Sequence, residues 1–408
     1  MMGKKEQGGF TLAAAEKMIA SYVRRTEGED VPLEASLFRA PVQSIRAVKA
    51  QPGYDQASRD GFVVSKEGAG QLQAGCSLGV EGEIQAGTTD PPHLRAGTAC
   101  RIMTGALIPA GGIRVIPQED CEVREGRLSV SGAVLERRNP FIRRQGSEID
   151  RGRVVAHAGS SILPDHLVLL AATGHSRILV HRRPRVAYFC TGSELVGRPD
   201  QERQGLKVSG NRYLLDGLIR MSGGIPGFLG TVADTEAELA RAFSRIDAEV
   251  PDFIISTGGM GPGKYDLLEE AFVRAGGRVL YRSLLVRPGK ATLFGLLGRI
   301  LFFGLPGPPP AAGALFSQLI GPTLLLAQGM RRPPGCRTHL DAPVVFKEKG
   351  VLRLLGGVLK KDSVRLAEKA EAASCHILFP AHRLNFKKGD AVRVSPLPFP
   401  RCYPLGLE

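Results

Sequence analysis

Three segments of the chain carry the residue types that bind phosphate and divalent cations, and each follows a predicted strand. The first, Thr191 to Glu194, ends in a carboxylate, and the second, Ser256 to Asp266, combines glycines with a terminal carboxylate. Glycines let backbone N–H groups approach phosphate, and carboxylates are ligands for hard divalent cations. The second segment has neither the Gly-Lys-Ser/Thr of a Walker loop nor a GxGxxG pattern. Its candidate phosphate-binding glycines are Gly258, Gly259, Gly261 and Gly263.

The third segment is a pair of loops in which prolines and basic side chains would shape an anion pocket. These loops run from Arg287 to Lys290 and from Leu305 to Pro309. When each of these segments is considered alone, a plain turn is a more common interpretation than a ligand-binding loop. Open α/β sheets bind ligands at the carboxyl ends of their strands, so convergence of the loops predicts a cationic cleft of phosphate size. The candidate contact residues from these loops are Arg287, Lys290, Pro306 and Pro309.

A further polar pair precedes these segments in the chain. Asp60 stands before Gly61-Phe62, and Thr104 lies in the run from Arg101 to Pro109. Both could reach a ligand, and a simple β-turn is the alternative interpretation. The eight histidines lack zinc-binding spacing, and neither an HExxH helix nor a Ser-His-Asp order is present. Any catalytic metal is therefore expected to be bound by oxygen.

Composition limits the classes of partner. The formal net charge of +14 favours anionic ligands, but the basic clusters lack the interleaved aromatics of a single-strand binding groove, so nucleic acid is not expected. The seven widely spaced cysteines form no CxxC pair and are expected to be reduced thiols in the cytoplasm. We expect no transmembrane segment and no membrane partner.

Apolar patterning predicts a modular α/β and β protein. Residues 1–48 and 141–181 are expected to form one interrupted domain. Residues 49–140 are rich in predicted strands and are expected to form a small all-β insert. Residues 182–330 alternate strands and helices, as in a central doubly wound α/β domain, and residues 331–408 predict a C-terminal β-barrel-like domain. Thr11 is expected to cap the first helix, and a proline at N1 starts another helix at Pro164.

The motifs, taken together and in order, resemble those of the molybdopterin molybdenumtransferase family, which includes the bacterial MoeA proteins and the gephyrin E domain. The resemblance spans nearly the whole chain, and several spaced matches are more specific than any single one. Its motifs are Asp60-Gly61-Phe62, Arg101 to Pro109 (the family's RIMTGAxxP), Arg144 to Ile149, Thr191 to Glu194, Gly258 to Asp266, and Pro288-Gly289-Lys290.

This resemblance implies a homodimer of elongated four-domain subunits, with the interrupted domain as the dimerisation domain. The active cleft would lie between the α/β domain of one subunit and the β insert of the other. The substrate implied is adenylylated molybdopterin, and molybdate or tungstate would be the co-substrate, with Mg²⁺ as cofactor and AMP as product. Molybdopterin adenylyltransferase and apo-molybdoenzymes are the protein contacts implied.

The resemblance also implies roles for individual residues. Lys290 and Arg287 would neutralise phosphate or molybdate charge. Carboxylates beside an anionic substrate repel it unless a cation intervenes, which is a physical reason to expect Mg²⁺. The catalytic set implied is Asp60, Thr104, Glu194, Asp234 and Asp266, and the metal ligands implied are Glu148, Glu194 and Asp234.

Departures from the family pattern cluster at the expected cleft. Ser193 replaces the aspartate of the TGDEL loop, Gly261 the serine of GGVS and Pro308 the asparagine of PGNP, and Arg59 stands at a usual methionine. Two explanations stay open: changed specificity, such as tungstate for molybdate, or a noncatalytic pterin-binding or scaffolding paralogue. A relation to molybdopterin adenylyltransferase alone is disfavoured by the β insert and the C-terminal domain.

Overall fold

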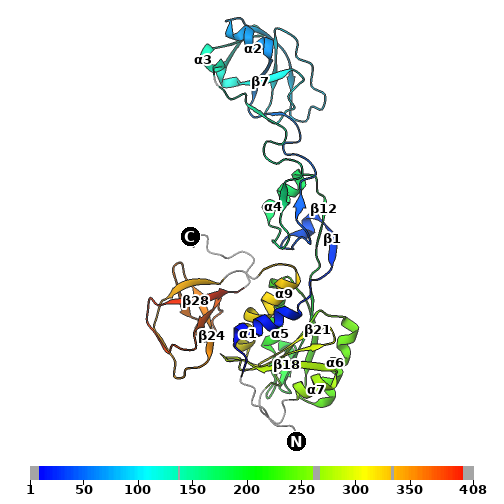
Figure 1. The fold of residues 1–408 in the computed structure, drawn as a ribbon, viewed down its shortest axis with the longest axis vertical. Helices are drawn as coiled ribbons and strands as arrows, with labels where there is room; N and C mark the ends of the chain where they lie inside the picture. Colours follow the sequence, from blue (N-terminus) through cyan, green and yellow to red (C-terminus); the bar gives the residue numbers. More distant parts are fainter. Residues whose placement is uncertain (1–8, 137, 261–266, 332–334, 398–408) are drawn as a thin grey trace.

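The chain forms successive units along an extended axis (Figure 1). The computed structural model describes residues 9–136, 138–260, 267–331 and 335–397. A β-rich unit lies at one end, a smaller unit lies in the middle, and the α/β sheet and a C-terminal barrel lie at the other end. The β-rich unit is therefore remote from the α/β sheet within one chain.

The α/β unit is built on a six-stranded sheet. Its strands follow the order β16-β13-β17-β21-β20-β18, in which the first four are parallel and the last two antiparallel. The parallel strands are nearly continuous apolar runs, as expected for strands that are covered on both faces. The bounds are β13 (Arg185–Thr191), β16 (Ile225–Val232), β17 (Phe253–Thr257), β18 (Gly277–Ser283), β20 (Ala291–Leu297) and β21 (Ile300–Leu305).

Alternate residues of these strands feed two separate cores, one on each face of the sheet. Val186 and Tyr188 belong to the first core, and Ala187 and Phe189 to the second. The first face is covered by α5 (Gly210–Met221) and the continuous run of α8 (Pro309–Leu315), η4 (Phe316–Ile320) and α9 (Gly321–Ala327). The second is covered by α6 (Glu236–Glu249) and α7 (Leu268–Arg274). The doubly wound α/β expectation is confirmed.

One helical run in the described residues has the length and apolar composition of a membrane span. It is Pro309–Ala327, and 78% of this run is buried inside the protein. We expected no segment of that length, but a helix that covers a sheet needs the same apolar composition. The run is a core helix of the α/β unit.

The N-terminal helix α1 (Leu12–Tyr22) forms as predicted but packs elsewhere than expected. The Thr11 Oγ1 accepts a hydrogen bond from the Ala14 N–H at 3.2 Å, which caps the helix. Its buried side chains, Leu12, Ala15 and Ile19, belong to the first core of the α/β unit. We had assigned residues 1–48 to the interrupted domain, so the assignment of this helix was wrong. An amphipathic pattern shows that one face of a helix is buried, but it does not show which unit buries that face.

The rest of the interrupted domain is brought together from distant segments. Strand β1 (Gly28–Pro32) pairs with β12 (Arg177–His181), and β2 (Ile45–Arg46) pairs with β11 (Val154–Ala156), both antiparallel. Helix α4 (Pro164–Ala172) has its expected proline at N1. The shared core is Val31, Leu33, Ala156, Ile162, Leu170, Ile178 and Val180.

The insert contains helices as well as strands. Its sheet has the order β7-β4-β6-β5-β9-β8. We expected an all-β insert, but α2 (Lys66–Gln73) starts where Ser65 Oγ accepts a hydrogen bond from Gly68 N–H, and α3 (Gly132–Leu135) follows later. Buried Leu72 of α2 packs in the core of this unit. The strands are β4 (Gly61–Ser65), β5 (Leu78–Ile84), β6 (Thr98–Ile102), β7 (Gly112–Pro117), β8 (Cys121–Arg124) and β9 (Arg127–Val130).

The C-terminal unit is a closed five-stranded barrel, as the sequence predicted. Its strands follow the order β24-β25-β22-β28-β26, and pairing of β26 with β24 closes the ring. A short strand, β19 (Val286–Arg287), extends from the α/β unit and pairs with β24. The bounds are β22 (Cys336–Leu340), β24 (Leu352–Leu359), β25 (Ser363–Leu366), β26 (Cys375–Phe379) and β28 (Ala391–Pro396).

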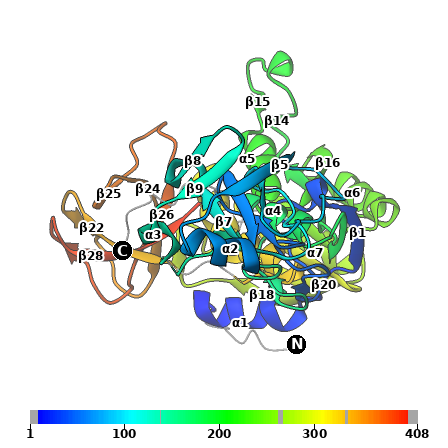
Figure 2. The same cartoon turned by 90° about the horizontal axis from the view of Figure 1, so that it is seen from above.

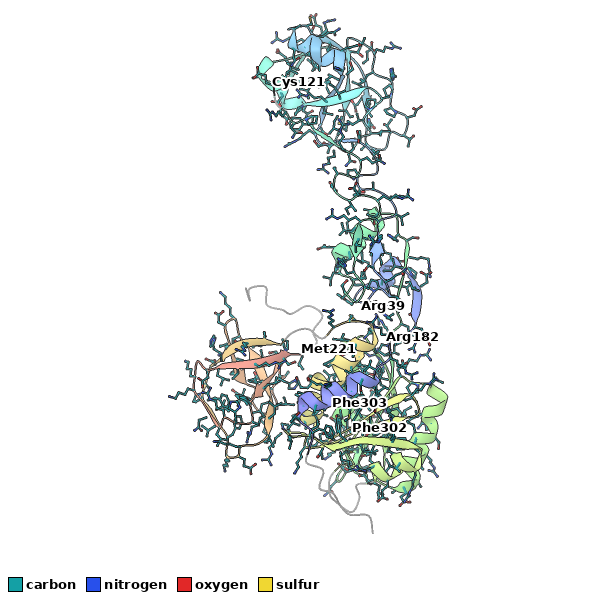
Figure 3. The ribbon with its side chains drawn as sticks, viewed as in Figure 1. Arg39, Cys121, Arg182, Met221, Phe302 and Phe303 are labelled. Atoms are coloured by element: carbon teal, nitrogen blue, oxygen red, sulfur yellow. The ribbon has the colours of Figure 1, made fainter. Side chains whose placement is uncertain are left out.

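Aromatic packing in the second core yields a stability prediction. Phe302 and Phe272 are fully buried and stacked, with ring centroids 4.3 Å apart, and Figure 3 shows Phe302 inside the α/β unit. Replacing Phe302 by Ala should cost about 3–5 kcal/mol of unfolding free energy because a cavity remains. Hydrogen exchange of β17 and β21 under urea measures the loss, with Phe302→Leu as a smaller-effect control. Equal protection in both variants would contradict this packing.

Candidate functional site

The carboxyl ends of the parallel strands meet at one edge of the sheet, where the chain reverses its direction of winding. From β13 the chain passes to β16 on one side, and β17 then pairs with β13 on the other side. In open α/β sheets, connections that leave in opposite directions mark the usual ligand position, which here falls between β13 and β17 and is called the crevice below. The loops after Thr191, Val232, Thr257 and Leu305 all border this edge.

Close backbone packing joins these loops. Gly258 has φ +93°, and a Cβ atom there would lie only 2.4 Å from the carbonyl oxygen of Thr191. Its N–H donates to the Leu305 carbonyl at 3.0 Å, and the Gly192 N–H donates to the Val232 carbonyl at 3.0 Å. Only glycine fits this approach at position 258 without displacing the neighbouring strand end. The glycine therefore fixes the shape of the crevice.

Two predicted carboxylates lie at this edge. The Asp234 N–H donates to Ser193 Oγ at 3.3 Å, and a Cβ on Gly259 would lie 3.8 Å from Asp234 Oδ1. Glu194 is exposed, and its Oε1 lies 3.2 Å from Nζ of Lys207. Lys207 begins β15 (Lys207–Val208), which pairs with β14 (Leu195–Val196) in an excursion that projects from the α/β unit (Figure 2).

Buried polar side chains lie near the carboxyl ends of β13 and β17 and the start of α5. Thr191 Oγ1, Ser256 Oγ and Asn211 Oδ1 are buried and have no hydrogen-bond partner among the residues that the structure describes. Such atoms cost free energy unless a ligand or water pairs with them. Sequence reasoning missed this group, although a Ser-Thr pair directly after Ile254-Ile255 at the end of a buried strand was a signal.

The N-terminus of α5 borders the same crevice. The Asn211 Nδ2 donates to the Gly307 carbonyl at 2.7 Å, and a Cβ on Gly210 would lie 3.7 Å from Pro309 Cγ. The first turn of α5 therefore lies beside the segment after β21, in which Pro306 belongs to the loop and Pro309 begins α8. Unpaired N–H groups and the helix dipole make such an end favourable for anions.

The two predicted cations are placed differently. Strand β20 is antiparallel to β21, so Lys290, just before β20, lies at the carboxyl end of β21 and is exposed. Arg287 instead forms an ion pair with Glu348, with Nη1 and Oε2 2.7 Å apart, next to the C-terminal barrel. Lys290 therefore lies at the edge where we expected both cations, whereas Arg287 already has a carboxylate partner.

Asp60 and Thr104 are brought together in the insert, although 44 residues separate them. The Thr104 hydroxyl and N–H both donate to Asp60 Oδ1 at 2.7 Å. These hydrogen bonds, led by that of the hydroxyl, and the nearby charge of Arg101 hold the pKa of Asp60 below its usual value. Asp60 is therefore ionised at neutral pH and fixed in orientation.

The expected metal ligands Glu148, Glu194 and Asp234 are not brought together within one chain. Glu148 precedes β11 of the middle unit in the chain, and its Oε1 is 3.8 Å from Nη1 of Arg143. Within the described ranges, no group of three or more His, Cys, Asp or Glu side chains is arranged to hold a metal ion. Gly261, Gly263 and Asp266, which were also predicted, lie outside the described residues.

The fold and the crevice define a class of protein, and family models match both halves of the chain. Residues 10–174 match the MoeA N-terminal region (domain I and II), and residues 187–325 match the probable molybdopterin binding domain. This pairing is that of proteins of molybdenum cofactor biosynthesis. The chain belongs to the molybdopterin molybdenumtransferase family, because its similarity to curated members extends over most of both chains.

Two relatives and one solved structure illustrate the similarity. The molybdopterin molybdenumtransferase of Haemophilus influenzae is 29% identical over 94% of this chain and 97% of its own length. That of a Nostoc species is 30% identical over 74% of this chain and 70% of its own. The molybdopterin biosynthesis MoeA protein of Pyrococcus horikoshii matches with a TM-score of 0.83 and 25% identity, covering 96% of this chain and 99% of that one.

The Asp60–Thr104 pair gives a pH prediction. Replacing Thr104 by Val removes the hydroxyl donor, so the pKa of Asp60 should rise toward its usual 3.8, whereas Thr104→Ser should retain the lowered value. Because the folded pKa is lowered, the pair stabilises the fold above pH 3.8 and this contribution is lost as pH falls through the folded pKa. Carboxyl ¹³C NMR titration measures the shift; identical titrations in all three proteins would refute it.

Proposed function

We propose that this protein transfers molybdenum from molybdate into adenylylated molybdopterin and releases AMP. The observation that carries the proposal is the set of groups at the switch point of the molybdopterin-binding domain: a glycine loop, two carboxylates and the exposed Lys290. Gly258 and Gly259 would admit a phosphate group to backbone N–H donors. Lys290 would neutralise part of the charge of the phosphate or of the oxyanion.

A divalent cation fits the carboxylates of this crevice. Glu194 and Asp234 offer hard oxygen ligands at one edge, and without a cation they would repel an anionic substrate. When bound, Mg²⁺ would polarise the phosphate and stabilise the charge that develops on it during cleavage. The family resemblance also extends this role to Glu148 and Asp266.

A homodimer would bring the insert of one subunit to the crevice of the other. Within one chain the insert, which contains the Asp60–Thr104 pair, lies at the opposite end of the molecule from the α/β unit (Figure 1). Helix α4 supports a dimer because it and the residue before it expose a group of apolar side chains: Leu163, Val168 and Leu169 are 45%, 67% and 38% exposed. An isologous interface here would make two equivalent sites.

The substitutions in the crevice favour a second candidate, a noncatalytic pterin-binding or scaffolding paralogue. Pro308 lacks the side-chain amide of the family's asparagine. Ser193, however, accepts the hydrogen bond from the Asp234 N–H and so positions the carboxylate. We therefore prefer the catalytic candidate, with tungstate as an alternative oxyanion.

Compartment and partners follow from the same proposal. Cys76, Cys100, Cys121, Cys190, Cys336 and Cys375 are free thiols, which suits a reducing cytoplasm. Molybdopterin adenylyltransferase would supply the adenylylated substrate, and apo-molybdoenzymes would receive the product.

The proposal is tested by AMP release from adenylylated molybdopterin in the presence of Mg²⁺ and molybdate, tungstate or neither. Release that depends on the oxyanion and stops in excess chelator is the expected result. Tight substrate binding without release in every arm would instead support the noncatalytic paralogue. Release that is undiminished by chelator would remove the cation from the mechanism.

Substitutions in the crevice should lower turnover more than they lower binding. Asp234→Asn and Lys290→Ala should each reduce kcat by about 10²-fold or more, because each removes a fixed charge at the reacting group. Asp362→Asn, on an exposed turn of the barrel, is the matched control and should behave as wild type. Steady-state AMP release gives kcat and KM separately. An unchanged kcat for Asp234→Asn would exclude Asp234 from the chemistry.

A further inference from the structure

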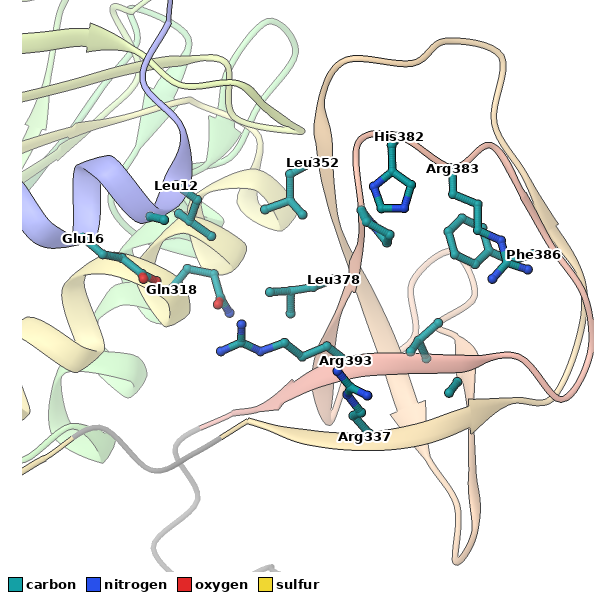
Figure 4. A pocket seen from close by; sticks show the side chains of 14 residues that line it. Leu12, Glu16, Gln318, Arg337, Leu352, Leu378, His382, Arg383, Phe386 and Arg393 are labelled. Atoms are coloured by element: carbon teal, nitrogen blue, oxygen red, sulfur yellow. The ribbon is translucent and has the colours of Figure 1, made fainter.

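A second cavity lies between α1, η4 and the C-terminal barrel (Figure 4). Its volume is about 510 Å³, in the range of sites for small molecules. Leu12 and Glu16 of α1 and Gln318 of η4 form one wall, and Arg337 and Arg393 of the barrel form another. It shares no lining residue with the crevice at the ends of β13 and β17.

Two arginines at this cavity come from facing positions on neighbouring strands. Strands β22 and β28 are antiparallel, and their register places Arg337 directly opposite Arg393. Like charges directly opposite each other on neighbouring strands destabilise a sheet. Across the described parts of the chain, neither side chain has a hydrogen bond or an ion pair. A bound anion would remove the repulsion between them.

The other arginines in the described part of the barrel all have polar partners. Arg353 donates to the Glu348 carbonyl oxygen, Arg365 pairs with Glu371, and Arg383 pairs with Asp390. Only Arg337 and Arg393, among the arginines of the described part of the barrel, are left without such partners, and both line the cavity. A random distribution of surface charge does not explain why the two arginines without partners face each other across β22 and β28.

The remaining lining sets the kind of ligand. Glu16 contributes one negative charge, but it lies on the opposite wall and has its own interaction. Asp390 offsets Arg383, so the Arg337–Arg393 pair leaves the cavity net positive. Paired guanidinium groups match the geometry and charge of a phosphate dianion better than a monocarboxylate. Leu12, Leu352 and Leu378 offer apolar surface to the rest of the ligand.

We propose that this cavity binds a small phosphorylated molecule, with Arg337 and Arg393 holding its phosphate group. The site is separate from the crevice in which the transfer chemistry is proposed, so it does not depend on that proposal. Its ligand combines a dianionic group with a compact, partly apolar body.

Isothermal titration calorimetry of the full-length protein with phenylphosphonate tests the proposal. Arg337→Gln and Arg393→Gln should each weaken binding by at least about tenfold, because each removes a charged donor to the dianion. Arg299→Gln, which removes an exposed positive charge from the β20–β21 turn, is the matched control and should bind as wild type. Lys290→Ala should also bind as wild type, because Lys290 belongs to the crevice.

Two further measurements make the outcome decisive. Without ligand, Arg337→Gln and Arg393→Gln should unfold at the same temperature as wild type or higher, since each relieves repulsion. Benzoate should bind at least about tenfold more weakly than phenylphosphonate, because it carries one charge. Binding that is lost in Lys290→Ala but kept in Arg337→Gln, equal affinity for benzoate, or no binding of phenylphosphonate would overturn the proposal.

Discussion

Parallel pairing of β13 with both β16 and β17 is the constraint on which the crevice depends. Because the chain leaves β13 toward one side and returns to the other, the loops that follow these strands separate and leave room for a ligand. Gly258 then lets the loop after β17 approach Thr191 more closely than any side chain would allow. The oxygens Thr191 Oγ1, Ser256 Oγ and Asn211 Oδ1 are buried near these strand ends and have no hydrogen-bond partner among the described residues.

The second constraint is the distance, within one subunit, between the insert and the α/β unit. The insert holds Asp60 ionised and oriented through two hydrogen bonds from Thr104, which is the preorganisation that an electrostatic role requires. The insert lies at the far end of the molecule from the α/β unit, which contains Glu194 and Asp234 (Figure 1). A single chain therefore separates the groups that the family resemblance combines in one site, and the exposed apolar face of α4 offers the means to reunite them in a dimer.

Much of the fold could be predicted because its signals are local. The apolar runs predicted the strands of the sheet, Thr11 and Pro164 predicted helix starts, and the rule for strand ends predicted the edge where Glu194 lies. Asp234 was expected at the site only because of the family resemblance. Other features depend on contacts between distant segments. The destination of α1, the ion pair of Arg287 with Glu348 and the opposition of Arg337 to Arg393 all arise from tertiary packing, which no local pattern encodes. The short helix α2 was missed because its glycines weaken the helical signal.

The assembly of one site from two subunits is the central claim, and mixed dimers test it most directly. Asp60→Asn and Asp234→Asn chains with different affinity tags are co-expressed, and heterodimers are purified and assayed for AMP release. Each homodimer should be inactive, whereas the heterodimer should regain about half of the wild-type activity, because one of its two sites contains only unaltered residues. Heterodimers as inactive as both homodimers would contradict a site shared between subunits.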